Sequence, residues 1–172
     1  MGEVPVALNL PSPDRMNAPA SPDQLMNLAL FMEFTRGEME TLIDLADPTL
    51  FRAGAVVVRQ DETGDALYIV ISGEVQVTHR RDGRDILLAT LGPGDFFGEV
   101  ALVDDGPRSA TVTAMQESLM LKVPQGVLRA LAGVYPNAAF KLLMTIAKVL
   151  VSRMRKGNTR YIDSLLAANT AK

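Results

Sequence analysis

Four residues near the middle of the chain carry groups suited to binding a phosphate. Residues 94–112 read GDFFGEVALVDDGPRSATV, which places Gly98 beside Glu99 and, nine positions after Glu99, Arg108 beside Ser109. The planar guanidinium of an arginine donates paired hydrogen bonds to phosphate oxygens, and a serine hydroxyl supplies one more donor. The spacing leaves room for one turn of helix and a short loop that folds back. The sequence therefore predicts a small phosphate site in this segment.

Gly98 and Glu99 suit the other side of such a site. A glycine lets the backbone approach a ligand closely, and a short helix from about Glu99 would direct its free N–H groups at an anion. Because a carboxylate repels a phosphate, we expect Glu99 to accept a hydrogen bond from a sugar hydroxyl. One arginine matches a singly charged phosphodiester better than a triphosphate, which calls for a lysine and a metal ion. The alternative is a surface turn in which Glu99 and Arg108 pair with each other.

The segment resembles the phosphate-binding cassette of cyclic nucleotide-binding domains, continuously over residues 94–112 through FGEVAL and PRSATV. This family includes regulatory subunits of the cAMP-dependent kinase, gated ion channels and bacterial catabolite-activator regulators. In the family the glutamate binds the ribose 2′-hydroxyl, the arginine binds the cyclic phosphate, and the next residue often contacts the phosphate or the base. Those roles would fall on Glu99, Arg108 and Ser109. The resemblance implies a nucleotide site formed by Phe97, Gly98, Glu99, Val100, Ala101, Pro107, Arg108, Ser109 and Ala110.

The resemblance leaves the base open. Ser109 is compatible with cAMP, whereas a hydroxyl at this position also suits the exocyclic amine of guanine in cGMP; we favour cAMP as the ligand. The last helix of the family lies over the base as a lid, and a count from Pro136 places Ser152 and Arg153 there. Arg153 would then stack on the purine as a cation–π contact.

Composition restricts the other classes of protein. Of 172 residues, 48% are hydrophobic and 22% are charged; there is no cysteine and a single histidine, His79, which we expect at an exposed strand end. Disulfides, thiolate metal sites and histidine-rich metal sites are excluded within one chain, so we expect no metal. The formal net charge of −3 argues against a dedicated nucleic-acid binder. No signal peptide and no apolar run of about 18 residues is present, so we expect a cytoplasmic protein outside the membrane.

Turn residues and apolar patterns predict an α+β fold, an antiparallel jelly-roll β-barrel flanked by N-terminal helices and a long C-terminal helix. Five glycines recur every nine or ten residues from Gly54 to Gly92 and separate short runs rich in Val, Ile and Leu, which is typical of a β-sandwich or barrel. The expected strands are residues 56–58, 66–71, 75–78, 86–91, 109–114 and 119–123, with hairpin turns at 61–65 and 82–83.

The regions on either side divide the chain into four parts. Residues 1–20, which hold four prolines, are expected to be a flexible lead-in. Residues 21–48 contain two short helices, one capped by Ser21 before Pro22 and one opened by a capping box from Thr35 to Glu38. Residues 49–124 form the β-roll with its cassette. Residues 125–172 form a hinge and a lid or dimerisation helix.

The long C-terminal helix is expected to bury two apolar stripes, because an apolar face this wide must be covered on two sides. We expect one stripe to pack on the barrel and the other on a partner, most economically the same helix of a second subunit. One stripe is Phe140, Leu143, Ala147, Leu150, Val151 and Met154; the other is Leu142, Ile146 and Val149.

These features predict a stand-alone cyclic nucleotide sensor domain and not an enzyme. Only sixteen residues follow Lys156, too few for the helix-turn-helix of the bacterial regulators, so no direct DNA binding is expected. The signal would pass through movement of the C-terminal helix to an unidentified effector protein. The alternatives are a degenerate cassette kept as a structural interaction module, and a jelly-roll enzyme, for which the chain lacks a metal site and a nucleophile with its base.

Overall fold

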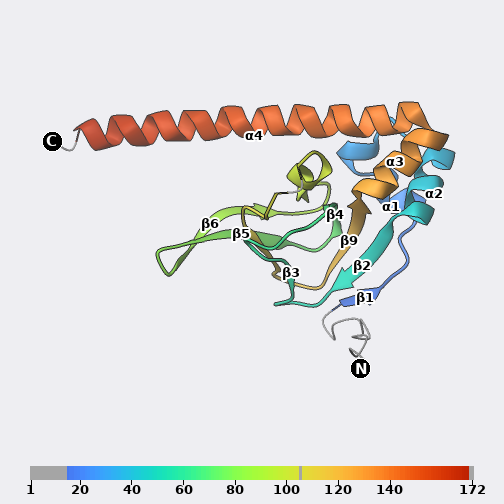
Figure 1. The fold of residues 1–172 in the computed structure, drawn as a ribbon, viewed down its shortest axis with the longest axis horizontal. Coiled ribbons are helices and arrows are strands. Elements are labelled where there is room, and N and C mark those ends of the chain that lie inside the picture. Colours follow the sequence, from blue (N-terminus) through green and yellow to red (C-terminus); the bar gives the residue numbers. More distant parts are fainter. Residues whose placement is uncertain (1–14, 105, 171–172) are drawn as a thin grey trace, which may run out of the picture.

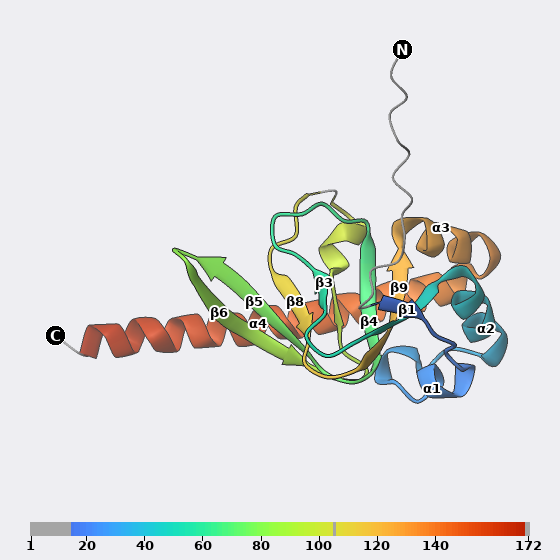
Figure 2. The same cartoon turned by 90° about the horizontal axis from the view of Figure 1, so that it is seen from below.

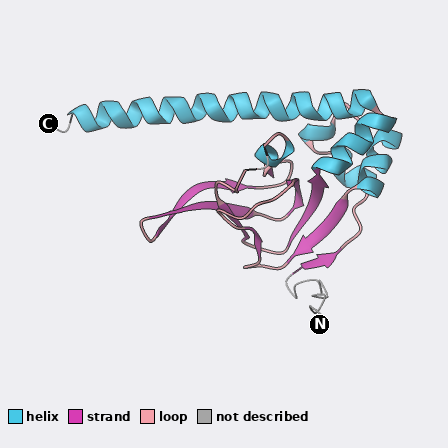
Figure 3. Cartoon of the chain, viewed as in Figure 1, coloured by secondary structure: helices cyan, strands magenta, loops and turns pink. Residues whose placement is uncertain are grey.

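The computed structural model describes residues 15–104 and 106–170, which form two antiparallel β-sheets with helices at one end and along one side (Figures 1 and 3). The strands of the five-stranded sheet, in spatial order, are β1 (Arg15–Asn17), β2 (Asp47–Phe51), β9 (Ser118–Pro124), β4 (Ala66–Ser72) and β7 (Phe96–Phe97). Those of the four-stranded sheet are β3 (Val56–Val58), β8 (Thr111–Ala114), β5 (Val75–Arg81) and β6 (Arg84–Leu91). The predicted α+β jelly-roll fold is confirmed.

The two faces of β4 explain how the five-stranded sheet joins two cores. Successive side chains of a strand point to opposite faces. Leu67 and Ile69 therefore pack against the helices, in one hydrophobic cluster, while Tyr68 and Val70 point between the two sheets and belong to a second cluster. Because both faces are covered, six of the seven residues of β4 are buried. The sheet is thus fixed from both sides, which gives the cassette a rigid base.

The N-terminal helices begin where the caps predict. The Ser21 hydroxyl accepts from the backbone N–H of Gln24 at the start of α1 (Pro22–Met26), and Thr35 and Glu38 form the expected capping box of α2 (Arg36–Leu45). A short 3₁₀ helix, η1 (Ala29–Phe31), lies between them. After the barrel, α3 (Gln125–Val134) is followed directly by α4 (Pro136–Thr170).

The helix α4 is 35 residues long, which corresponds to about 52 Å. Its first half packs on α3 and on the cluster beside the five-stranded sheet through Leu142 and Ile146, which are buried, and Val149, which is half-buried. Phe140 and Met154, from the other expected stripe, are 64% and 60% exposed. Its second half runs past the barrel alongside the β5–β6 hairpin (Figures 1 and 2). No helix of the described residues is apolar over a length that would cross a bilayer.

Three expectations about local structure were wrong. Residues 15–17 were expected in the lead-in but form β1, which pairs with β2; the rest of the expected lead-in up to residue 14 lies outside the described residues. Residues 47–51 were not among the expected strands, yet they form β2 between β1 and β9. The turn at residues 61–65 does not close a hairpin, because β3 and β4 lie in different sheets. The hairpin turn at 82–83 is confirmed, with positive φ at both residues.

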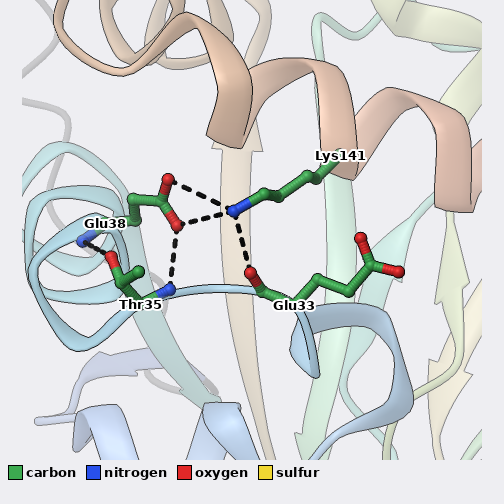
Figure 4. Close-up of polar contacts among 4 residues, drawn as sticks. All are labelled: Glu33, Thr35, Glu38 and Lys141. Carbon is green, nitrogen blue, oxygen red and sulfur yellow. Dashed lines mark hydrogen bonds and ion pairs between the residues drawn. The ribbon is translucent and has the colours of Figure 1, made fainter.

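A buried ion pair joins α4 to the N-terminal helices (Figure 4). The Lys141 ammonium donates to the Glu38 carboxylate at 3.2 Å and to the Glu33 carbonyl at 2.8 Å. Glu38 is 7% exposed and also accepts from the Thr35 backbone N–H at 2.8 Å. Burial alone would raise the pKa of Glu38, but the Thr35 N–H and the Lys141 ammonium outweigh it and lower that pKa below 4.5.

Replacing Lys141 with methionine should lower the free energy of unfolding at neutral pH by about 1.5–3 kcal/mol, because the buried Glu38 carboxylate loses a charged donor. Arg36→Met is the matched control, since it removes two mostly exposed ion pairs, to Asp23 at 2.9 Å and to Glu40 at 3.0 Å, and it should change stability little. Urea unfolding at one protein concentration measures both. Equal effects of the two substitutions would contradict a special role for Lys141.

The same pair predicts a pH dependence. Because the pKa of folded Glu38 is lowered, its contribution to stability is present above the ordinary value of 4.5 and is lost as pH falls through the lowered pKa. The difference in unfolding free energy between the wild type and Glu38→Gln should therefore shrink from about pH 6 to about pH 3. A constant difference over this range would show that the ionised pair contributes nothing.

Candidate functional site

The expected phosphate segment folds into a strand, a tight turn and one turn of helix. The strand β7 ends at Phe97, and Gly98 follows with φ of +77°, a conformation that favours glycine. The short 3₁₀ helix η2 (Glu99–Leu102) begins directly after it, as the sequence predicted, and lies between the barrel and α4 (Figure 1). A Cβ at Gly98 would lie 2.6 Å from Nη1 of Arg108 and 2.8 Å from the Ala66 carbonyl oxygen, so only glycine fits.

Two hollows that share lining residues bring the predicted residues together. The smaller has a volume of about 90 Å³ and is lined by residues 98–101 and 106–109. The larger, of about 380 Å³, is bounded by the barrel, the cassette and α4, and is in the size range of small-molecule sites. Gly98, Glu99, Arg108 and Ser109 line both. A ligand that spans the two hollows would therefore meet all four residues.

The guanidinium of Arg108 is held between two glycines. Its Nη2 donates to the Ala66 carbonyl at 2.9 Å and its Nη1 to the Gly98 carbonyl at 3.2 Å. A Cβ at Gly64 would approach Nη2 to 2.5 Å, so the absence of a side chain there makes room for the guanidinium. Two of the five guanidinium N–H groups are used in this way, which leaves donors for a ligand.

The backbone around Arg108 is fixed from two directions. Its N–H donates to the Glu62 carbonyl at 2.8 Å, and its carbonyl accepts from the Asp61 N–H at 2.9 Å. On the other side, Nδ1 of His79 in β5 lies 2.9 Å from the Ser109 carbonyl oxygen. His79 is therefore half-buried and bonded to the cassette, whereas the sequence placed it at an exposed strand end. The loop at residues 61–64 and the strand β5 together set the position of the arginine.

Glu99 and Arg108 face one space without pairing. Within the described residues, no ion pair of 4.0 Å or less joins the Glu99 carboxylate to Arg108, whose guanidinium donates instead to the carbonyl groups of Gly98 and Ala66. A turn closed by this salt bridge, which was the alternative interpretation, is therefore not what forms. The carboxylate and the guanidinium are both available to a ligand.

The helix α4 closes the larger hollow with a cationic face. Arg153, Lys156, Gly157 and Arg160 line it at helical spacing. The Arg153 guanidinium donates to the Phe96 carbonyl at 2.9 Å, lies 4.6 Å from the centre of the Phe96 ring and is 3.8 Å from the Asp95 carboxylate. It is thus stacked on Phe96 of the barrel. Ser152, the other residue expected at the lid, is exposed and does not line the hollow.

The sequence profile of the cyclic nucleotide-binding domain matches residues 48–135, which is 88 of the 172 residues. The chain belongs to the cyclic nucleotide-binding domain family. A relative is the CRP-like cAMP-activated global transcriptional regulator of Mycobacterium tuberculosis, 33% identical over 140 residues that cover 81% of this chain and 61% of that protein. The chain thus spans less than two thirds of the length of this relative.

Two solved structures are similar to the structure of this chain. The catabolite activator protein of Thermus thermophilus has a TM-score of 0.67 at 29% identity, over 77% of this chain and 61% of that one. A cyclic nucleotide-binding domain from Methylobacillus flagellatus has a TM-score of 0.78 at 21% identity, over 88% and 90% of the two chains. Because the identity is only 21%, the second comparison supports the fold alone.

The other residues predicted at the site differ in their burial and in the hollow that they line. Phe97 is buried and stacks on Tyr68, with ring centres 5.2 Å apart. Ala101 and Ala110 are buried, whereas Val100 is 52% exposed. Pro107 is exposed and forms an isolated bridge with Thr63. Val100, Ala101 and Pro107 line only the smaller hollow, and Ala110 lines only the larger one.

Several residues that shape the candidate site were not predicted from the sequence. Gly64 was interpreted only as a turn residue, although any side chain at this position would displace the Arg108 guanidinium. Lys156 and Arg160 were given no role at the site, but they line the larger hollow together with Gly157. Their spacing of four residues on one helical face was the available signal. Leu88 was expected in a strand and was given no role at the site, yet it lines the larger hollow from β6.

Proposed function

We propose that this chain binds a cyclic nucleotide between its cassette and α4, and that the phosphate lies against Arg108 and Ser109. The observation that carries the proposal is that Glu99 and Arg108 line the same two hollows and do not pair with each other. The unused N–H groups of Arg108 would donate to the phosphate oxygens. The Glu99 carboxylate would accept from the ribose 2′-hydroxyl. The base would extend into the larger hollow, between α4 and the apolar side chains of the barrel that line it.

The proposed ligand is cAMP in preference to cGMP. Support comes from the Mycobacterium tuberculosis relative, which is described as cAMP-activated. The site offers one arginine and one serine to the phosphate, in keeping with a ligand that carries a single charge there. The proposal includes no metal ion.

The proposed output is a movement of α4 and not a reaction. Arg153 supports this coupling, because it joins α4 to the carbonyl of Phe96, two residues before Gly98. A shift of the cassette around a phosphate would therefore change the partner of Arg153 and the position of the helix. The ligand can move the equilibrium only through its different affinities for the two positions.

The proposal extends to partners and place. The exposed apolar side of α4, which includes Val151 and Met154, would pack against the same helix of a second copy, giving a homodimer. An effector protein would receive the signal, and the chain would act in the cytoplasm without binding DNA itself. The absence of cysteine is compatible with a reducing compartment.

A thermal-shift titration with cAMP, cGMP and 5′-AMP tests the proposed function. At a concentration about 100 times the dissociation constant, a ligand adds about 2.7 kcal/mol of stability, which should raise the melting temperature by roughly 5–10 °C for a chain of this size. We expect both cyclic nucleotides, cAMP more than cGMP, to stabilise the protein, and 5′-AMP to do so far less. Absence of any shift at millimolar concentrations would support a degenerate cassette that serves as an interaction module.

A further inference from the structure

Two cations of α4 face the larger hollow without a partner. Lys156 and Arg160 line it on either side of Gly157, one and two turns beyond Arg153. Arg153 is bound to Phe96 and Asp95. By contrast, neither the Lys156 ammonium nor the Arg160 guanidinium makes a hydrogen bond or ion pair within the part of the chain that the structure describes. Both groups are therefore free to bind what enters the hollow.

The wall opposite these cations is apolar and offers no acceptor side chain. It is formed by strands β3, β5, β6 and β8 and consists of Val58, Val77, Leu88, Ala89, Leu91 and Val112. Among the described residues, Glu99 is the single carboxylate that lines the hollow, against the four cations Arg108, Arg153, Lys156 and Arg160. The proposed function assigns Glu99 to the ribose, so the groups left for the base are donors.

Hydrogen-bond donors can distinguish guanine from adenine at the edge of the base that carries N7 and the substituent at position 6. Lysine and arginine side chains donate hydrogen bonds and accept none. Guanine presents two acceptors at its N7 and O6 atoms, whereas adenine presents an acceptor at N7 and a donor at N6. A pair of donors therefore matches guanine at both positions and adenine at one.

We propose that Lys156 and Arg160 bind the N7–O6 edge of a purine and keep the affinity for 6-oxopurine cyclic nucleotides close to that for cAMP. This inference rests on the proposed function, and it adds a second permitted class of ligand to the same site. The geometry of α4 favours it, because the spacing of three and then four residues from Arg153 to Lys156 and Arg160 keeps them on one face. The exposed apolar side chains Val151 and Met154 lie on another face of the helix.

The test measures dissociation constants by calorimetry for cAMP, cGMP and inosine 3′,5′-cyclic monophosphate (cIMP). Inosine carries the oxygen of guanine at position 6 and lacks its 2-amino group, so cIMP separates the proposed contact from any contact of Ser109 with the 2-amino group. The variants are Lys156→Ala with Arg160→Ala, each substitution alone, and Arg155→Ala. Arg155→Ala is the matched control, since this substitution removes one exposed positive charge from the same helix at a position outside the hollow.

In the double variant we expect cGMP and cIMP to bind roughly tenfold more weakly, and cAMP to change less than about threefold, because a good pair of base contacts discriminates by about 1–3 kcal/mol, or roughly 5- to 150-fold. Arg155→Ala should leave the ratio of the constants unchanged. An equal loss for all three nucleotides would show a general charge effect and overturn the inference. An unchanged ratio in the double variant would also overturn it while leaving the proposed function intact. Failure of the wild type to bind any cyclic nucleotide would overturn both.

Discussion

Arg108→Ala should bind cyclic nucleotide roughly 100-fold more weakly than the wild type, or not measurably. The substitution removes the only guanidinium that borders the smaller hollow of the described structure, and a charge-assisted, two-pronged contact to phosphate is worth several kcal/mol. The barrel should remain folded. Arg108 is half-buried and its two hydrogen bonds go to carbonyl groups of Ala66 and Gly98, so we expect a loss of about 1–2 kcal/mol in stability.

Two comparisons make the Arg108 result specific. Arg108→Lys keeps the charge but lacks the planar fork of donors, and it should recover only part of the affinity. Arg129→Ala removes an exposed arginine from α3, away from the hollow, and should bind as the wild type does. Calorimetry gives the affinities, and circular dichroism of each variant shows that the fold is kept. Binding by Arg108→Ala within a few-fold of the wild type would mean that the phosphate lies elsewhere.

Gly64→Ala tests the position of the same guanidinium without removing it. The new Cβ would lie 2.5 Å from Nη2 of Arg108, and the guanidinium is the mobile end of a long side chain, so it should move while the fold loses little stability. We expect weaker binding at almost unchanged melting temperature. Gly83→Ala is a control for the same exchange in the hairpin turn, where a Cβ meets nothing within 4 Å but φ is +76°; it should cost stability and leave affinity unchanged.

Much of the fold could be predicted because its signals are local. The apolar run of β4, the Ser21 N-cap, the Thr35–Glu38 capping box and the Asp82–Gly83 turn each depend on neighbours within a few residues. The cassette was found in the same way, since Gly98, Glu99, Arg108 and Ser109 lie within one short segment. These four residues are close to one another both in the sequence and in the structure.

The parts that could not be predicted depend on contacts between distant residues. β1 and β2 carry weak strand signals, and they form because β9 supplies a pairing edge for β2 and β2 supplies one for β1. Gly64 lies far from Arg108 in the sequence, and no periodicity shows that one makes room for the other. The stacking of Arg153 on the Phe96 ring also joins distant residues, 57 positions apart in the sequence. Helical spacing could give its face but not the aromatic ring that the barrel presents to it.

The exposed side of α4 carries a heptad pattern that is regular along nearly the whole helix. Exposed residues follow one another at alternating spacings of four and three, and all but one are apolar: Phe140, Met144, Ala147, Val151, Met154, Asn158, Tyr161, Leu165 and Ala168. This spacing is that of a two-stranded coiled coil. A single asparagine at a core position of such a coil fixes register and the number of chains, and Asn158 occupies that position. The pattern supports pairing of α4 with the same helix in parallel.

Placing charge in this seam should convert the proposed dimer to a monomer. In Val151→Glu with Met154→Glu, four carboxylates would meet across the helix pair without partners, and burying them costs more than the packing of the seam provides. Ser152→Glu with Thr159→Glu adds the same charge at exposed positions outside the seam and should remain dimeric. Sedimentation equilibrium over a range of concentrations measures both. The barrel of the seam variant should still melt cooperatively and bind nucleotide, because Leu142 and Ile146 hold α4 from the opposite side. A wild type that sediments as a monomer at all concentrations would refute the pairing and leave the exposed stripe to the effector protein.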